Sequence, residues 1–315
     1  MSLHSMKSFI IDLLENNDIF DFPLLVLRGN DNYSDEMGDI DVLVPTSFNN
    51  NACYKLIEFI RDDGWEAVGF RELEYLSSIV LINSILFPYK AIKIDFFGGI
   101  GWFGVNASNN DHLSFSHLLN ESERDKASSA ITLAHKLMYA GGFNKKDINR
   151  LQANIDYSIE LLKLKDLVDS NIIFNKKITF PLKWRIRLRL SGYRKVSMFI
   201  WFYKILFRYL YFKFKNIFRS EGRIFLHSSS GLEEPISKIF IDTYSSSGDK
   251  NLPIAFKSTN DISITLPRES ILGEVSIDLS GLPIKEAVNN LNKKIDDLIF
   301  LELQKKYNKK EFQYD

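Results

Sequence analysis

Cysteine is almost absent from this chain of 315 residues. Cys53 is the single one, so an intrachain disulfide is excluded, as is typical of proteins that fold in a reducing compartment. Residues 1–17 also lack the basic start, long apolar stretch and small-residue cleavage site of a signal peptide. Their pattern predicts an amphipathic helix instead, and we expect a cytoplasmic protein.

Net charge is also absent, because 40 basic residues balance 40 acidic ones. The balance is uneven along the chain, since residues 183–223 hold twelve lysines and arginines against one acid, Glu221. The rest of the chain therefore carries an acidic excess, and the overall value describes no particular surface. The length and a hydrophobic content of 45% predict a globular protein with room for two cores.

Two carboxylates stand at the start of a short apolar run. Residues 38–44 have the sequence GDIDVLV, and an apolar run that ends at Arg28 and Gly29 precedes them. In an extended strand, Asp39 and Asp41 lie on one face, roughly 7 Å apart. Such a pair repels itself and loses hydration unless a cation or hydrogen-bond donors lie between the two groups.

A third carboxylate follows about fifty residues later. Residues 91–97, AIKIDFF, form another apolar run with one acid, Asp95. If this strand lies beside the first, three oxygen ligands converge and suit two divalent cations such as Mg²⁺. The sequence therefore predicts a metal site built from Asp39, Asp41 and Asp95.

This order of elements resembles the polymerase-β-type nucleotidyltransferase superfamily: a strand ending in glycine, a polar loop, Asp-x-Asp on a second strand and a later lone Asp. Within it, the chain is most similar to nucleotidyltransferase-like proteins of bacterial polysaccharide biosynthesis clusters, some of them fused to a thymidylate-kinase-like domain. The likeness covers roughly residues 5–165. It is carried by Leu27-Arg28-Gly29, Gly38-Asp39-Ile40-Asp41-Val42-Leu43-Val44, Gly64-Trp65 and Ile94-Asp95-Phe96.

The resemblance implies a small mixed sheet with helices and a nucleoside triphosphate substrate held through two Mg²⁺ ions. Gly29 and Asn30 would lie against the phosphates, and Arg28 would neutralise charge. In one departure, the superfamily usually has Gly-Gly or Gly-Ser where this chain has Gly29-Asn30. Asparagine tolerates unusual backbone angles and donates a hydrogen bond, so phosphate binding stays open at this position.

Helices after the core close the nucleotide site in related proteins, and a lysine there often meets phosphate. Lys136 and Lys146 are the candidates here, and an equally simple interpretation makes them exposed helix charges. His135 has apolar neighbours on the same helix, which favours a packed histidine.

The basic stretch has two parts. Residues 183–190, KWRIRLRL, alternate cation and apolar residue, which favours a strand and leaves a short helix open. Residues 198–218 are apolar and aromatic, with Lys204, Arg208 and Lys215 near one helical face. The cations argue against a membrane span. Residues 183–219 therefore predict a segment that lies on an anionic membrane surface.

Two alternatives stay open for this segment. It can be a buried interdomain helix whose cations reach outward, or a platform for nucleic acid with stacking aromatics. The aliphatic content argues against nucleic acid. We accordingly expect a cytoplasmic protein that lies peripherally on the inner face of the membrane.

A second α/β unit begins at residue 222. The stretch RIFLH, Arg223 to His227, predicts a strand; a helix from residue 233, three strands and a long terminal helix from Ile284 to about Tyr307 follow. The unit resembles a degenerate P-loop kinase, since LHSSSGLEEP (226–235) lacks the first glycine and the lysine of a phosphate-binding loop. We expect no ATP-dependent kinase activity here.

The predicted organisation has four parts within a mixed α/β (α+β) fold. They are a nucleotidyltransferase-like core (1–120), a helical extension that closes the site (121–175), a basic aromatic linker (176–221) and the degenerate kinase-like domain (222–315).

The first functional hypothesis is metal-dependent transfer of a nucleotidyl group from an NTP to a hydroxyl acceptor, such as a sugar or lipid-linked glycan in envelope polysaccharide synthesis. The second is a catalytically idle nucleotidyltransferase-like scaffold at the membrane. The third is the nucleotidyltransferase toxin of a toxin–antitoxin pair.

Overall fold

The chain folds into a mixed α/β structure built on two sheets, as the sequence predicts. The structure is a computed structural model. It describes residues 3–15, 19–28, 39–45, 48–73, 75–99, 101–102, 105–106, 124–139, 143, 148–149, 151–175, 178–190, 203, 206–211, 213–214, 222–228, 231–248, 252–257, 262–266 and 272–311. None of the helices within these ranges is long and apolar enough to cross a membrane.

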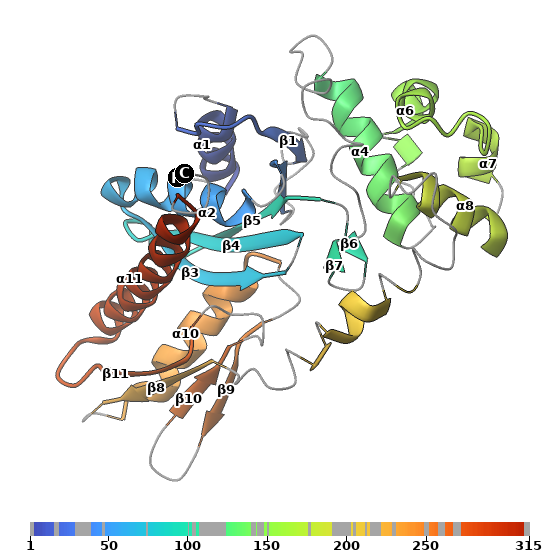
Figure 1. Ribbon diagram of the computed structural model, residues 1–315. Helices are drawn as coiled ribbons and strands as arrows, with labels where there is room; N and C mark the ends of the chain where they lie inside the picture. Colours follow the sequence, from blue (N-terminus) through green and yellow to red (C-terminus); the bar gives the residue numbers. More distant parts are fainter. Residues whose placement is uncertain are drawn as a thin grey trace.

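Five strands form the first sheet in the order β1-β2-β5-β4-β3 (Figure 1). Strands β2 and β5 are parallel, and the other pairs are antiparallel. The strands span Leu25–Arg28 (β1), Ile40–Leu43 (β2), Trp65–Glu72 (β3), Leu76–Asn83 (β4) and Ala91–Phe97 (β5). The parallel pair places the two predicted acidic strands side by side.

Alternation along β5 defines the two faces of this sheet. Ile92, Ile94 and Phe96 point to one face, which we call the core face, and Lys93 and Asp95 point to the other, the acidic face. A register shift between Ala67 and Gly69 of β3 exchanges the faces along that strand.

Helices α1 (Leu3–Glu15), α2 (Asn49–Ile60) and α11 (Ile284–Glu311) cover the core face (Figure 1). Phe9 of α1 stacks on Trp65 with ring centroids 5.8 Å apart. Tyr54 of α2 stacks on Phe300 and Tyr307 of α11, at 5.3 Å and 4.9 Å. The last helix of the chain is therefore part of the core of the first sheet.

Two further helices, α4 (Arg124–Tyr139) and α10 (Glu233–Ser245), lie against the acidic face. Ile131 of α4 packs on Leu25, Leu27 and Leu43. Tyr244 of α10 crosses β3 so closely that a Cβ on Gly69 would overlap its ring. Between these two contacts, the face carries the predicted acidic residues.

The second sheet has the order β11-β8-β10-β9, and only its β8–β11 pair is parallel. Its strands are Arg223–His227 (β8), Ile254–Lys257 (β9), Ile262–Thr265 (β10) and Glu274–Asp278 (β11). One continuous cluster of buried apolar residues joins this sheet, α10 and α11 to the first sheet. The predicted boundary at residue 222 therefore does not separate two cores.

A separate apolar cluster holds α4 together with three other helices. They are α6 (Ile155–Leu161), α7 (Ser170–Asn175) and α8 (Phe180–Leu190). The described chain also contains short elements: η1 (Arg61–Asp63), η4 (Gln152–Asn154), β6 (Gly101–Trp102) and β7 (Val105–Asn106).

The favoured strand over residues 183–190 is wrong, because these residues belong to helix α8. Ile186 and Leu190, four residues apart, are the buried positions of that helix, which is the spacing of one helical face. Packing in the helical cluster thus overrides the local alternation. The prediction of a terminal helix from Ile284 to about Tyr307 is confirmed, and α11 extends to Glu311.

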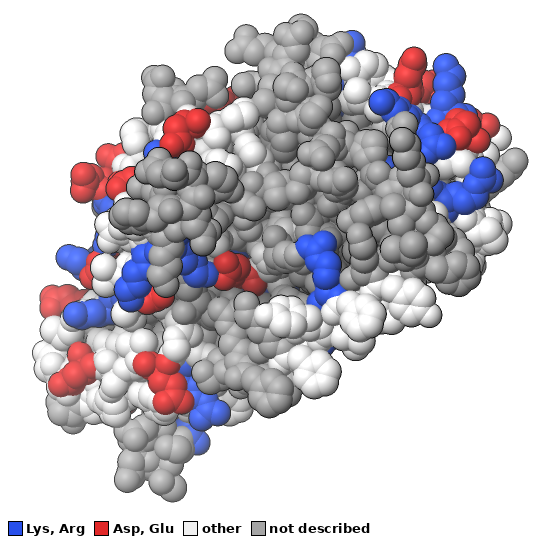
Figure 2. Space-filling model, viewed as in Figure 1, with Lys and Arg blue, Asp and Glu red and all other residues white. Residues whose placement is uncertain are grey.

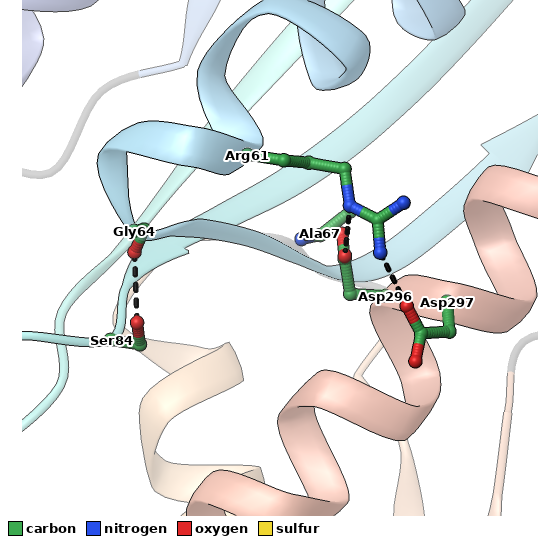
Figure 3. Close-up of polar contacts among 6 residues, drawn as sticks. All are labelled: Arg61, Gly64, Ala67, Ser84, Asp296 and Asp297. Atoms are coloured by element: carbon green, nitrogen blue, oxygen red, sulfur yellow. Dashed lines mark hydrogen bonds and ion pairs between the residues drawn. The ribbon is translucent and has the colours of Figure 1, made fainter.

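Polar contacts fix α11 against the end of α2 and against β3 (Figure 3). Asp296 accepts a hydrogen bond from the Ala67 backbone N–H at 2.8 Å and an ion pair from Arg61 Nε at 2.9 Å. Arg61 also donates to Asp297, and the Ser84 hydroxyl donates to the Gly64 carbonyl at 2.9 Å. The contacts of Asp296 and Asp297 join parts of the chain more than two hundred residues apart.

Replacing Glu66 by Gln is expected to raise the free energy of unfolding near pH 8 by about 1 kcal/mol, after allowance for solvent screening. Burial and then repulsion from Asp296 raise the pKa of Glu66 to about 7, from an ordinary value of 4.5. The folded protein therefore binds this proton more tightly than the unfolded chain does. The free energy of unfolding consequently falls as pH rises from about 4.5 to about 7. Urea unfolding at several pH values measures the effect. A gain from Glu66→Gln that does not shrink toward about pH 5 contradicts it.

Candidate active site

A row of polar residues crosses all five strands of the first sheet. Register pairs Arg28 with Asp41, Asp41 with Asp95, and Asp95 with Ser78. Ser78 in turn pairs with Arg71 on β3. Because directly opposed residues share a face, Asp41 and Asp95 lie next to each other on the acidic face.

Lys93 joins this row to the acid that precedes β2. Its Nζ donates to Asp39 Oδ2 at 3.0 Å and to Asp95 Oδ2 at 2.8 Å. Lys93 and Asp95 are two residues apart on β5, so both side chains leave the same face of the sheet. One ammonium group therefore lies between two of the three predicted carboxylates.

The electrostatics of this cluster reflect its burial. Burial alone would lower the pKa of Lys93, but attraction to Asp95 and Asp39 outweighs it and raises the pKa. Burial raises the pKa of Asp95, and Lys93 opposes that rise. Asp95 Oδ1 is buried and has no hydrogen-bond partner among the described residues. Such an oxygen is costly to leave unsatisfied and is a ready acceptor for a ligand.

The three acids differ in their access to solvent. The side chain of Asp39 is 36% exposed, whereas Asp41 and Asp95 are each only 6% exposed as residues. Burial lowers the pKa of Lys7 on α1, and attraction to the nearby Asp39 carboxylate partly opposes this lowering. A ligand that enters the site would therefore reach Asp39 before the two buried acids.

The carboxylate oxygens of Asp39, Asp41 and Asp95 are chemically suited to a hard divalent cation. Carboxylate oxygens are the ligands that Mg²⁺ prefers, and Asp95 Oδ1 is an acceptor still to be satisfied. In the arrangement of the described residues, no three carboxylate, imidazole or thiol side chains are gathered closely enough to hold a metal ion. Lys93 supplies the positive charge between Asp39 and Asp95, and its side chain must turn aside before a metal can join those two acids.

The structure describes only some of the other predicted site residues. Gly29, Asn30 and Lys146 lie outside the described residues, and of Arg28 only the backbone is described. Lys136 is half-buried on α4, next to His135, whose ring packs edge-on against Phe97 at 4.9 Å. The prediction of a packed histidine agrees with that contact. Helix α4 thus covers the acidic face two residues beyond Asp95.

Two residues of the site were missed by the sequence analysis. Lys93 was available from its spacing, because AIKIDFF places a lysine two residues before the acid in an otherwise apolar strand. Ser78 lies opposite Asp95 on β4, and no local signal in its strand marks it. A buried lysine on the same strand face as a candidate ligand therefore merits inclusion in any such prediction.

The loop between β8 and α10 occupies the place of a phosphate-binding loop in the second unit. There the backbone N–H of Ser228 donates to Glu233 Oε1 at 2.8 Å, and Glu234 pairs with Lys257 at 3.0 Å. A carboxylate thus takes a backbone donor of the kind that binds phosphate in such loops.

Comparison with known proteins found no matching family model, no matching curated protein and no matching solved structure. The nucleotidyltransferase resemblance therefore remains a prediction based on the residues and their arrangement.

Proposed function

We propose that this protein transfers a nucleotidyl group from a nucleoside triphosphate to a hydroxyl acceptor. The observation that supports this proposal is that Asp41 is paired with Asp95 across two parallel strands, while Asp39 and Asp95 bind a single ammonium group. Carboxylates on neighbouring strands are the type of ligand that metal-assisted phosphoryl chemistry uses.

Each residue has a distinct task in this proposal. Asp39 and Asp41 would hold a divalent cation, with Asp39 at the accessible rim of the site. Asp95, at the buried end, orients the acceptor hydroxyl for in-line attack at the α-phosphorus, with pyrophosphate as the leaving group. Bound Mg²⁺ supplies charge neutralisation and lowers the pKa of the acceptor hydroxyl.

Lys93 has a place in the same scheme. If a divalent cation were bound by the carboxylates, the Lys93 ammonium group would be free to bind a phosphate oxygen, for which lysine is a common partner. Gly29, Asn30 and Arg28 remain the proposed phosphate contacts at the end of β1. The acceptor is proposed as a sugar or a lipid-linked glycan.

A second candidate function is an idle nucleotidyltransferase-like scaffold, and the position of Lys93 favours it. An ammonium group that already satisfies Asp39 and Asp95 removes the electrostatic demand for a metal. In that case the face binds no catalytic cation, and the protein acts through its surfaces alone.

Isothermal titration calorimetry with Mg²⁺ and each of the four common NTPs tests the proposal. We expect wild type to bind one of them in a Mg²⁺-dependent manner, and Asp41→Asn to weaken that binding at least about tenfold by removing a ligand charge. Asp156→Asn, a change of the same kind at an exposed position of α6, is the matched control and should bind as wild type does.

The result also separates the two candidates. If wild type and Asp41→Asn bind every nucleotide equally weakly, the proposed transfer reaction is wrong and the scaffold is favoured. If binding is strong but independent of Mg²⁺, the role given to the acids is wrong.

A further inference from the structure

An exposed apolar stripe occupies the helical residues of the basic stretch. Residues 203, 206–211 and 213–214 are helical, and five large apolar side chains among them are between 43% and 71% exposed. They are Tyr203, Phe207, Leu210, Tyr211 and Phe214. Their intervals of 4, 3, 1 and 3 residues place all five on one face of a helix.

This exposure argues against one of the interpretations left open by the sequence, the buried interdomain helix. An interdomain helix buries its apolar face and directs its cations to solvent. Here the apolar face is not buried, because Phe207 is 69% and Tyr211 is 71% exposed. At the position of this helix, yellow in Figure 1, Figure 2 shows white ring-bearing side chains beside a blue one on the surface. Most of the area of these apolar side chains is therefore open to solvent.

Charge identifies the kind of surface that fits this face. From residue 170 to residue 220 the sequence has no aspartate or glutamate, and residues 183–219 contain eleven lysines and arginines. Arg208 and Lys213 lie within the helical residues, and the Lys213 ammonium group is 5.8 Å from the centre of the Tyr209 ring. This apolar stripe is flanked by cations and has no acids beside it. It therefore matches the surface of a bilayer, which has an apolar interior and, where the lipids are anionic, negatively charged headgroups.

We propose that the stripe of Tyr203, Phe207, Leu210, Tyr211 and Phe214 binds the surface of a bilayer that contains anionic lipid. The phenyl and leucyl groups enter the boundary between headgroups and acyl chains, where amphipathic helices bury their apolar face. The tyrosine hydroxyls stay at headgroup level, and Arg208 and Lys213 meet lipid phosphates. This inference is independent of the proposed transfer reaction, since it uses none of the residues of the acidic face.

Vesicle flotation with the full chain tests the inference. The probes are vesicles of phosphatidylcholine alone and vesicles with about a third phosphatidylglycerol. We expect at least about tenfold tighter binding to the anionic vesicles, weakened by salt because surface charges are screened. The double variant Phe207→Ser/Tyr211→Ser should lose at least about tenfold of that affinity.

Matched controls keep the test specific. Phe256→Ser removes an aromatic ring of comparable exposure, 55%, from strand β9 in the second sheet and should leave vesicle binding unchanged. Arg208→Gln/Lys213→Gln should reduce the salt dependence while retaining binding through the stripe. Thermal melting of each variant should match that of wild type, because all these side chains are exposed.

Three outcomes would overturn the inference. One is failure of wild type to bind either vesicle. Another is vesicle binding that Phe207→Ser/Tyr211→Ser leaves intact. The third is self-association, seen by light scattering without lipid and abolished by the same double variant, which would assign the stripe to a second copy of the chain.

Discussion

Lys93→Met is expected to lower the free energy of unfolding by about 3 kcal/mol in buffer without divalent ions. The substitution keeps most of the side-chain volume but removes the ammonium group that binds Asp39 and Asp95. Two carboxylates then face each other, one of them buried, and this uncompensated charge is costly. Urea unfolding of wild type and variant in the presence of a chelator measures the loss.

The same variant reveals whether the acids form a metal site. If Mg²⁺ can replace the ammonium group, millimolar Mg²⁺ should restore most of the lost stability, because a ligand that binds only the folded state stabilises it. The variant should also bind Mg²⁺ more tightly than wild type, since no lysine has to be displaced. Calorimetric titration with Mg²⁺ alone measures this without any need for enzymatic activity.

Lys305→Met is the matched control, because Lys305 forms an exposed ion pair with Glu302 within one helix. Exposed pairs of this kind contribute little, so its stability should match that of wild type with and without Mg²⁺. A Lys93→Met protein that loses stability but regains none in Mg²⁺ would show that the acidic face is not a cation site. The scaffold function would then be the better conclusion.

Asp296→Ala is expected to cost about 3 kcal/mol of unfolding free energy. Asp296 is 2% exposed, accepts the Ala67 backbone N–H and pairs with Arg61 (Figure 3). Its removal leaves a strand N–H without this acceptor and Arg61 without its buried partner. Because α11 shares one core with the first sheet, we expect these two parts to unfold in the same urea transition in both proteins.

Asp297→Ala provides the matched control on the same helix. Asp297 also pairs with Arg61, but its side chain is 42% exposed, so its loss should cost less than about 1 kcal/mol. Equal losses from the two variants would show that burial of Asp296 does not determine the strength of this contact. Unfolding of α11 at a lower urea concentration than the first sheet would show instead that the two unfold independently.

Much of the fold could be predicted because its strands are short apolar runs with one or two charges. The positions of Asp41 and Asp95 within such runs were enough to predict strands β2 and β5, and alternation predicted which side chains share a face. The pairing of Asp41 with Asp95 then follows once the two strands lie side by side. The long helix α11 and strand β8 were equally clear from their periodicity.

Other features depend on contacts that no local pattern reveals. The helix at residues 180–190 forms because the surrounding helices bury Ile186 and Leu190, so tertiary packing overrides an alternating sequence. The docking of α11 on β3 joins Ala67 to Asp296, 229 residues later. Lys93 can bind both Asp95 and Asp39 only because the chain enters β2 beside β5. The local sequence around these residues does not determine that path.

The continuous apolar cluster also limits how this chain can be divided. If residues 1–221 were produced without the rest, Tyr54 would lose both rings that cover it, and the bared core face would favour aggregation. Transfer of residues 222–315 to another protein is restricted too. Helix α10 packs closely only on a strand that has glycine where Tyr244 crosses it, as Gly69 does here. Neither part is therefore expected to fold alone. A chain divided into two fragments for engineering should be cut in a surface loop that leaves both sheets and α11 in one fragment.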